Sequence, residues 1–118
     1  MALHSDLPIY KVAYDLLGHV LMLARNMPRD VKQQVGGALR DECISITVLI
    51  FRANVARDKG PPLLEAIERL QVAELLLRLS HDLHFIAPKQ YATAIALTSQ
   101  IGKQANGWRK KYLPSPAA

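Results

Sequence analysis

Hydrophobic residues recur at spacings of three and four in four segments of the chain, and proline or glycine separates these segments. This spacing is typical of helices that bury one face. Proline is favoured in the first turn of a helix, so it marks the expected starts. The chain carries this signal at Pro8, Pro28, Gly60-Pro61-Pro62 and Pro88. The predicted helices span residues 8–26, 29–57, 61–84 and 88–112, and their short connections predict an all-α fold, an antiparallel up-down four-helix bundle.

The second predicted helix contains the two segments that least resemble a helix. Residues 43–51 are rich in β-branched side chains and by propensity could form a strand. We interpret them as helical, because the chain has only one such run and a strand would have no partner. The Gly36-Gly37 pair is the other weak point, since each glycine costs about 1 kcal/mol relative to alanine inside a helix. A break or a kink is therefore expected there.

The third predicted helix is apolar over more than one face. One stripe consists of Leu63, Ile67, Leu70 and Leu77, and a neighbouring one of Val72, Leu76, Leu79 and Leu83. A helix so broadly apolar needs a second partner, which in a small domain predicts self-association. The fourth helix is expected to have a single buried seam, made of Tyr91, Ile95, Thr98, Ile101, Ala105, Trp108 and Tyr112.

The size and composition of the chain suit one compact domain. With 118 residues, of which 50% are hydrophobic, it is expected to bury one core without disulfides or a structural metal. We assign residues 1–113 to a single domain and the proline-containing residues 114–118 to a disordered tail. The one cysteine, Cys43, cannot form an internal disulfide. No apolar stretch reaches the roughly 20 residues of a membrane span, and no secretion signal opens the chain, so a reducing cytoplasm without a membrane partner is expected.

The formal net charge is +5, and its distribution along the chain is uneven. Residues 1–83 contain ten basic and ten acidic side chains, which cancel. The remaining residues contain no acidic side chain and five basic ones: Lys89, Lys103, Arg109, Lys110 and Lys111. Such one-sided charge is typical of a surface that contacts phosphate. The alternative is that basic C-terminal turns complement the negative end of a helix dipole.

Several basic residues fall in register along the predicted helices. Lys89, Lys103 and Lys110 are separated by multiples of seven, so they share a face of the fourth helix. Lys11 and Arg25 are fourteen residues apart on the first helix. Cations on one face can neutralise successive phosphates with little dependence on sequence, whereas the alternative is an ordinary solvated face. The candidate nucleic-acid contacts are Lys11, Arg25, Arg29, Lys32, Lys89, Lys103, Arg109, Lys110 and Lys111.

One aromatic residue lies beside these cations. Trp108 precedes Arg109 and could stack on an unpaired base, as aromatic residues do in proteins that bind single strands. Its position on the predicted seam favours a packing role instead.

Neither a metal site nor a catalytic site is expected. His81 and His84 lie three residues apart, with Glu74 one helical repeat earlier, but the paired Glu-x-x-His motif of a di-iron bundle is absent. A zinc site would need three or four suitable ligands, and the single cysteine leaves that set incomplete. The chain also lacks a glycine-rich phosphate loop and a Gly-x-Ser-x-Gly elbow, and Cys43 lies in an apolar run that disfavours its thiolate. The sequence therefore predicts a non-enzymatic protein without a cofactor.

The order of particular residues resembles a known family. The segments that carry the resemblance are residues 7–16 (LPIYKVAYDL), 27–28 (MP), 39–40 (LR) and 44–46 (ISI). They resemble the four-helix proteins encoded in intervening sequences of bacterial large-subunit ribosomal RNA genes. Residues 7–112 as a whole more closely resemble the accessory variability determinants of phage diversity-generating retroelements. Where the intervening-sequence proteins commonly continue Ser-Ile-Pro-x-Asn-Ile-Ala-Glu-Gly, this chain continues SITVLIFRA from Ser45, which favours the retroelement family.

The resemblance implies a homo-oligomer, a pentameric barrel of four-helix bundles, in the cytoplasm of the bacterial host. It also implies binding of RNA and DNA and association with the element's reverse transcriptase, for mutagenic copying of template RNA into cDNA. The residues themselves support a helical fold, surplus apolar surface for oligomer contacts and a basic face. A second hypothesis is a homo-oligomeric protein-interaction scaffold for which nucleic-acid binding is incidental.

Overall fold

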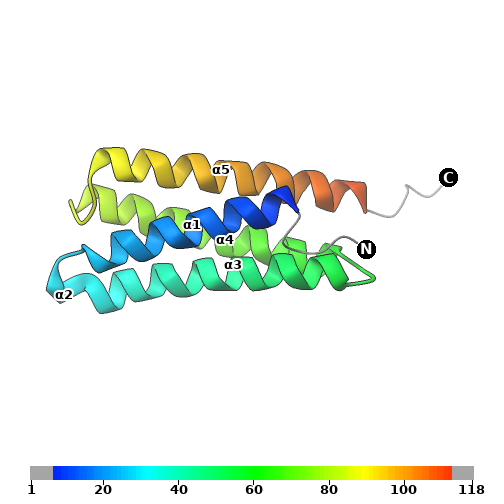
Figure 1. Ribbon diagram of the computed structural model, residues 1–118, viewed down its shortest axis with the longest axis horizontal. Coiled ribbons are helices and arrows are strands. Elements are labelled where there is room, and N and C mark those ends of the chain that lie inside the picture. Colours follow the sequence, from blue (N-terminus) through cyan, green and yellow to red (C-terminus); the bar gives the residue numbers. More distant parts are fainter. Residues whose placement is uncertain (1–6, 113–118) are drawn as a thin grey trace.

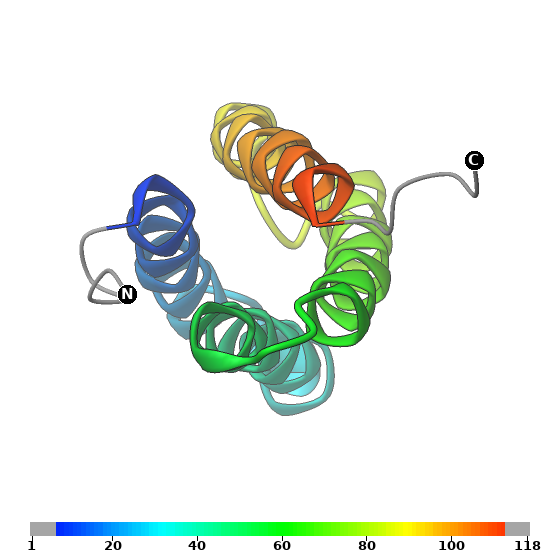
Figure 2. The ribbon, with the colours of Figure 1, turned by 90° about the vertical axis from the view of Figure 1, so that its right-hand side faces the viewer.

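The computed structural model describes residues 7–112, and all regular structure in this range is helical. Its elements are α1 (Pro8–Arg25), α2 (Arg29–Val31), the π-helix η2 (Lys32–Gly36), α3 (Gly37–Val55), α4 (Gly60–Asp82) and α5 (Pro88–Lys111). The four long helices run side by side in alternating directions (Figure 1), and seen end-on they surround a common centre (Figure 2). The predicted four-helix bundle is thus confirmed, with α2, η2 and α3 together forming the predicted second helix. The predicted disordered tail, residues 114–118, lies outside the described residues.

The prolines mark the helix starts as predicted. Pro8 is the first residue of α1 and Pro88 the first of α5, while α4 begins one residue before Pro61. At the start of α5 the amide of Ala87 donates to Oε1 of Gln90 at 2.8 Å. Such bonds matter because the first amides of a helix have no acceptor within it.

Each long helix contributes one buried face to a common core. Burial of each large aliphatic side chain stabilises the fold by about 1.5–3 kcal/mol. The fully buried aliphatic side chains with the largest volumes are Leu16, Leu23, Leu39, Ile46, Ile50, Leu63, Leu77, Ile101 and Val20. They come from α1, α3, α4 and α5, so the core extends along the bundle.

Small residues on α5 shift its buried face away from part of the predicted seam. The buried residues of α5 are Ala94, Thr98, Ile101 and Ala105. Among the other predicted seam residues, Tyr91, Ile95 and Trp108 are only half-buried, and Tyr112 is 46% exposed. A Cβ at Gly102 would lie 3.4 Å from Cδ2 of Leu70, which shows how closely α5 approaches α4. The prediction that Tyr112 is buried is therefore wrong, because this residue caps the C-terminus of α5.

The irregularity predicted at Gly36-Gly37 is a π-helical turn, not a break. The π-helix η2 ends at Gly36, and both glycines have helical dihedral angles. A π-helical turn inserted in an α-helix changes which residues face the core and often bends the axis. Residues 43–51 belong to α3, so their predicted helical structure is confirmed.

Polar groups inside the bundle are bonded to neighbouring helices. Thr98 is fully buried, and its hydroxyl donates to Oε2 of Glu74 on α4 at 3.0 Å. Nε2 of His19 lies 3.0 Å from the carbonyl oxygen of Gln90, which joins α1 to α5. Within residues 7–112, every helix is too short or too polar to cross a lipid bilayer.

Two outward faces of the bundle are apolar. The α4 stripe consists of the exposed residues Val72, Leu75, Leu79 and Leu83. The α3 stripe consists of the exposed residues Ile44, Val48, Phe51 and Val55. The prediction that the third helix is apolar on two sides is confirmed, but Leu76 of the predicted outer stripe is half-buried against the core, and Leu75, 66% exposed, takes its place. Exposed apolar faces of this kind are typical of surfaces that contact another protein.

Candidate nucleic-acid interface

Eight of the nine predicted nucleic-acid contacts are exposed, and Arg109 is half-buried. Within residues 7–112, the ion pairs to carboxylates are made by other residues, namely Arg40 with Asp41, Arg69 with Glu42, and Arg78 and His81 with Asp82. The nine predicted cations are therefore not neutralised by carboxylates of the described chain. A cation without a carboxylate partner can exchange its solution anions for phosphate.

Three of the lysines form a stripe along α5. Lys89, Lys103 and Lys110 are all exposed, opposite the buried residues of the same helix. At 1.5 Å per residue, the distance along the helix from Lys89 to Lys110 is about 30 Å. We call these residues the α5 lysine stripe. Their predicted common face is confirmed, while their contact with phosphate remains a prediction.

Arg109 is separated from this stripe. Successive residues of an α-helix are rotated by about 100°, so the side chain before Lys110 points elsewhere. Nε of Arg109 is buried and has no hydrogen-bond partner among the described residues. Of the nine predicted contacts, Arg109 is the least available to a large polyanion.

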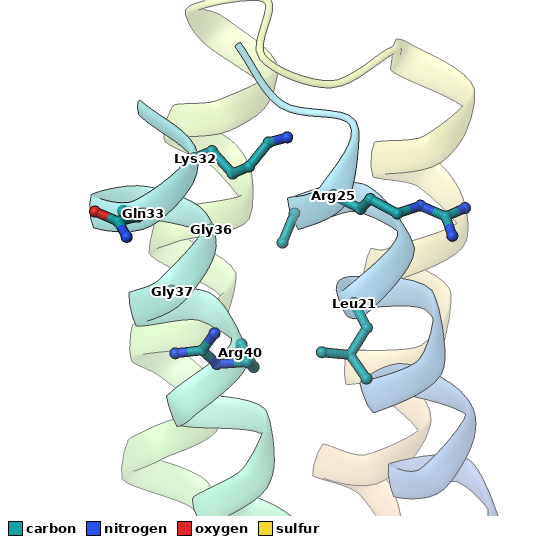
Figure 3. Close-up of a pocket in the computed structure, with 8 residues that line it drawn as sticks. Leu21, Arg25, Lys32, Gln33, Gly36, Gly37 and Arg40 are labelled. Carbon is teal, nitrogen blue, oxygen red and sulfur yellow. The ribbon is translucent and has the colours of Figure 1, made fainter. Parts of the chain in front are cut away.

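A groove between α1 and η2 brings together predicted cations from the two sides of the α1–α2 turn. The groove has a volume of about 540 Å³ and is lined by Leu21, Ala24, Arg25, Lys32, Gln33, Gly36, Gly37 and Arg40. Figure 3 shows the ammonium of Lys32 pointing into the space between η2 and α1, whereas Arg25 points away from η2. Arg29, in the short α2 between them, is also exposed. The side chains of Lys32 and Arg25 therefore diverge, so they suit two phosphates better than one.

Arg40 is a lining residue that the sequence analysis did not select. Its Nε donates to Oδ1 of the adjacent Asp41 at 3.2 Å, so its charge is partly balanced. The spacing between Arg40 and Lys32 is two helical turns, and this could have suggested a shared face had the π-helical turn been foreseen.

The start of α1, the α3–α4 connection and the end of α5 lie at the opposite end of the bundle (Figure 2), and residues from all three line a second hollow. We call it the end pocket; its volume is about 570 Å³. It is lined by Leu7, Asn54, Val55, Ala56, Arg57, Lys59, Trp108, Lys111 and Tyr112. Only Trp108 and Lys111 among these were considered as candidate binding residues. The up-down topology places the loop before α4 beside the end of α5. From this topology, Arg57 and Lys59 could have been predicted to lie near Trp108.

Lys59 contacts both the end of α3 and the end of α5 in the end pocket. Its Nζ donates to the carbonyl oxygens of Ala53, Asn54 and Ala56 at 2.9, 3.1 and 3.1 Å. Nζ also lies 5.7 Å from the ring centroid of Trp108 and 5.4 Å from that of Tyr112. An ammonium near the last carbonyls of a helix and over aromatic rings is electrostatically stabilised. Lys59 thus ties the C-terminus of α3 to the end of α5.

The residues considered for metal binding or catalysis have other contacts. Among residues 7–112, no group of three or more His, Cys, Asp or Glu side chains could hold a metal ion. Nδ1 of His81 lies 3.1 Å from Oδ1 of Asp82, and its ring centroid lies 4.7 Å from that of Tyr91. Cys43 is buried, and this burial, aided by the charge of Glu42, raises its thiol pKa from 9.0 to about 12. A thiol with that pKa is a poor nucleophile near neutral pH.

The chain is similar to a known protein family. Residues 8–112 match the model of a protein family described as bAvd-like. Comparisons with curated proteins and with solved structures gave no match. The matched range includes every helical element of the bundle, from the start of α1 to the end of α5. Because the family match extends over the whole helical bundle, the chain belongs to the bAvd-like family.

Proposed function

We propose that the chain is a non-enzymatic accessory protein of a diversity-generating retroelement. In this role it binds RNA and DNA through its basic surface and associates with the element's reverse transcriptase for mutagenic cDNA synthesis. Membership of the bAvd-like family indicates an accessory protein of a diversity-generating element, and this family is not a known catalytic one.

The observation that carries the nucleic-acid proposal is the set of exposed cations without carboxylate partners in residues 7–112. Each lysine or arginine that contacts a phosphate releases a condensed counterion, so affinity falls as salt rises. The α5 lysine stripe, together with the groove cations Arg25 and Lys32, offers several such contacts. Contacts of this kind position a polyanion without selecting its sequence.

The direct test is a titration of a mixed-sequence RNA with the whole protein at several salt concentrations. We expect the logarithm of the affinity to fall linearly with the logarithm of the salt concentration, by about 0.7 per contacted phosphate on a single strand. An affinity that does not change with salt would remove the electrostatic mechanism.

A charge-deletion variant locates the contacts. Replacing the three residues of the α5 lysine stripe, Lys89, Lys103 and Lys110, together with glutamine is expected to weaken binding to all sequences alike and to lower the salt slope by about 2. The matched control replaces Arg52, Arg69 and Arg78 together with glutamine, because these three exposed cations of α3 and α4 lie outside the predicted contacts. Equal loss in the control would show a dependence on net charge rather than on the stripe.

Association with the reverse transcriptase is tested by co-purification of the tagged protein from cells that contain the complete element, followed by identification of the bound protein and nucleic acid. Recovery of the polymerase in stoichiometric amounts supports the proposal. Its absence, with nucleic acid retained, would leave a nucleic-acid-binding protein without the proposed partner.

A second candidate function is a homo-oligomeric protein-interaction scaffold. The α4 stripe favours it, because a helix with one buried and one exposed apolar face has surface left for a partner. The pentameric barrel implied by the family resemblance would place five copies of the 13.1 kDa chain in one particle. A solution mass measurement tests this assembly, and a strict monomer at micromolar concentration would contradict it.

A further inference from the structure

The end pocket combines aromatic surface with free volume. Trp108 is half-buried, and Tyr112 is 46% exposed, so part of the tyrosine ring is open to solvent. Both rings line a hollow of about 570 Å³. Volumes of about 300–1,000 Å³ are usual for small-ligand sites in proteins. The pocket can therefore accept a planar group of the size of a nucleobase.

The charge of the pocket has one sign. Its lining contains three cations, Arg57, Lys59 and Lys111, and no acidic residue. The ammonium of Lys59 already donates to three backbone carbonyls, which makes it a positioning residue. Arg57 and Lys111 are both exposed and are left for an external anion. A ligand with an apolar planar part and a negative group matches this lining.

Lys111 is placed to bind the negative group of such a ligand while its planar part lies near Tyr112. Its Nζ lies 5.8 Å from the ring centroid of Tyr112. A phosphate held by Lys111 would bring its own nucleoside close to the tyrosine ring. Stacking of a base on an aromatic side chain is the usual way in which proteins hold single strands without selecting a sequence.

From these contacts we infer that the end pocket binds one unpaired nucleotide of a single-stranded nucleic acid, with its base against Tyr112 and Trp108 and its phosphate at Lys111 and Arg57. This inference rests on the proposed function and adds a preference for single strands. A base inside a duplex is covered on both faces by its neighbours, so it cannot stack on Tyr112 unless it is extruded. The α5 lysine stripe is expected to contact phosphates alone, and such contacts carry no such preference.

The experiment compares a labelled 12-nucleotide single-stranded RNA with a blunt duplex of the same sequence, at one salt concentration and with the full chain. We expect Tyr112→Ala to weaken binding of the single strand about tenfold, which corresponds to about 1.4 kcal/mol, and to change duplex binding less than twofold. Tyr112→Phe keeps the ring and should restore single-strand binding. Tyr14→Ala is the matched control, because Tyr14 is a 63% exposed tyrosine on α1, outside the pocket.

A spectroscopic signal reports on the pocket independently of affinity. Trp108 is the chain's only tryptophan, so tryptophan fluorescence, excited selectively over the four tyrosines, reports on this site alone. The single strand is expected to quench it in the wild type and in Tyr112→Phe, and the duplex to leave it nearly unchanged. Unfolding curves of the variants show whether any loss of binding reflects a loss of structure.

The outcomes separate the inference from the proposed function. Equal binding of single strand and duplex, with no effect of Tyr112→Ala, would overturn the inference and leave the proposed function standing. Equal weakening of both RNAs by Tyr112→Ala would also overturn it, since the pocket would then serve any phosphate backbone. Binding of neither RNA would overturn both.

Discussion

Gly36 of η2 packs directly against Ala24 of α1. A Cβ added at Gly36 would lie 3.0 Å from Cβ of Ala24 and 3.3 Å from its Cα. Both distances are shorter than nine in ten real Cβ contacts, and one of these atoms belongs to the backbone of α1. The glycine therefore sets the distance between α1 and the π-helical turn, along the groove that carries Lys32 and Arg25.

Gly36→Ala is expected to destabilise the protein by about 1 kcal/mol, although alanine is the better helix former. The propensity gain of about 1 kcal/mol is opposed by overpacking, which costs typically 1–3 kcal/mol. Gly37→Ala is the control: its nearest atom is a flexible guanidine nitrogen of Arg40 at 3.7 Å, so this change should stabilise by about 0.5–1 kcal/mol. Urea unfolding measures both. Stabilisation by both changes would show that α1 moves aside easily.

Lys59→Met is expected to destabilise the protein by about 1–2 kcal/mol. Methionine keeps much of the apolar stem, but it removes the ammonium that donates to three carbonyls at the end of α3. The favourable interaction with the helix dipole is lost as well. Chemical denaturation gives the free energy, and the fluorescence of Trp108, whose ring faces Lys59, should shift in the folded state.

Lys110→Met provides the comparison for Lys59. Lys110 is exposed, so its replacement should change stability by less than about 0.5 kcal/mol. If the two methionine variants were equally stable, the hydrogen bonds of Lys59 would contribute nothing measurable to the fold.

Because its thiol pKa is raised in the folded protein, Cys43 should lower the free energy of unfolding at high pH. Burial, with a smaller effect of Glu42, raises the thiol pKa from 9.0 to about 12 in the folded protein. At a pH between these two pKa values, the thiol is deprotonated in the unfolded chain and protonated in the folded protein. The free energy of unfolding therefore falls as pH rises. The slope reaches about 1.4 kcal/mol per pH unit.

The measurement compares unfolding free energies of the wild type and Cys43→Ala at pH 8 and pH 10, so that contributions from other groups cancel. The wild type should lose more stability over this interval, and its thiol should resist alkylation until the protein unfolds. Rapid alkylation of the folded protein at pH 8 would contradict the burial of Cys43.

Local sequence signals were sufficient to predict most of the helical architecture. Proline fixes a helix start through its own ring, so Pro8 and Pro88 could be placed without knowledge of the fold. Gly36-Gly37 marked the weak point of the second helix, but glycine propensity does not say how a helix accommodates it. The π-helical turn places Gly36 against Ala24, which lies on another helix, and local propensity cannot predict such a contact.

The candidate surface was less predictable, because it depends on which helix ends meet. Heptad spacing placed Lys89, Lys103 and Lys110 on one exposed face. Arg109 was predicted as a contact because it lies in a basic run with Lys110 and Lys111. It is half-buried and points about 100° away from Lys110, so this prediction has less support. Lys59 lies far from α5 in sequence, so its contact with Tyr112 could be found only from the topology.

The α4 stripe leads to the last prediction, that replacing Leu75 and Leu79 together with glutamate dissociates the protein into monomers. Both side chains are exposed in the single chain, at 66% and 42%, so the substitutions should leave its helical spectrum and unfolding free energy nearly unchanged. In an oligomer that buries this stripe, each new carboxylate would lose its hydration without a partner, which strongly disfavours assembly. Replacing Leu21 and Met22 together with glutamate adds the same charge to two exposed apolar residues of α1, at 45% and 37%, and should keep the assembly. Light scattering of the three proteins at equal concentration measures the outcome, and an unchanged mass for the double variant would mean that another face, such as the α3 stripe, joins the subunits.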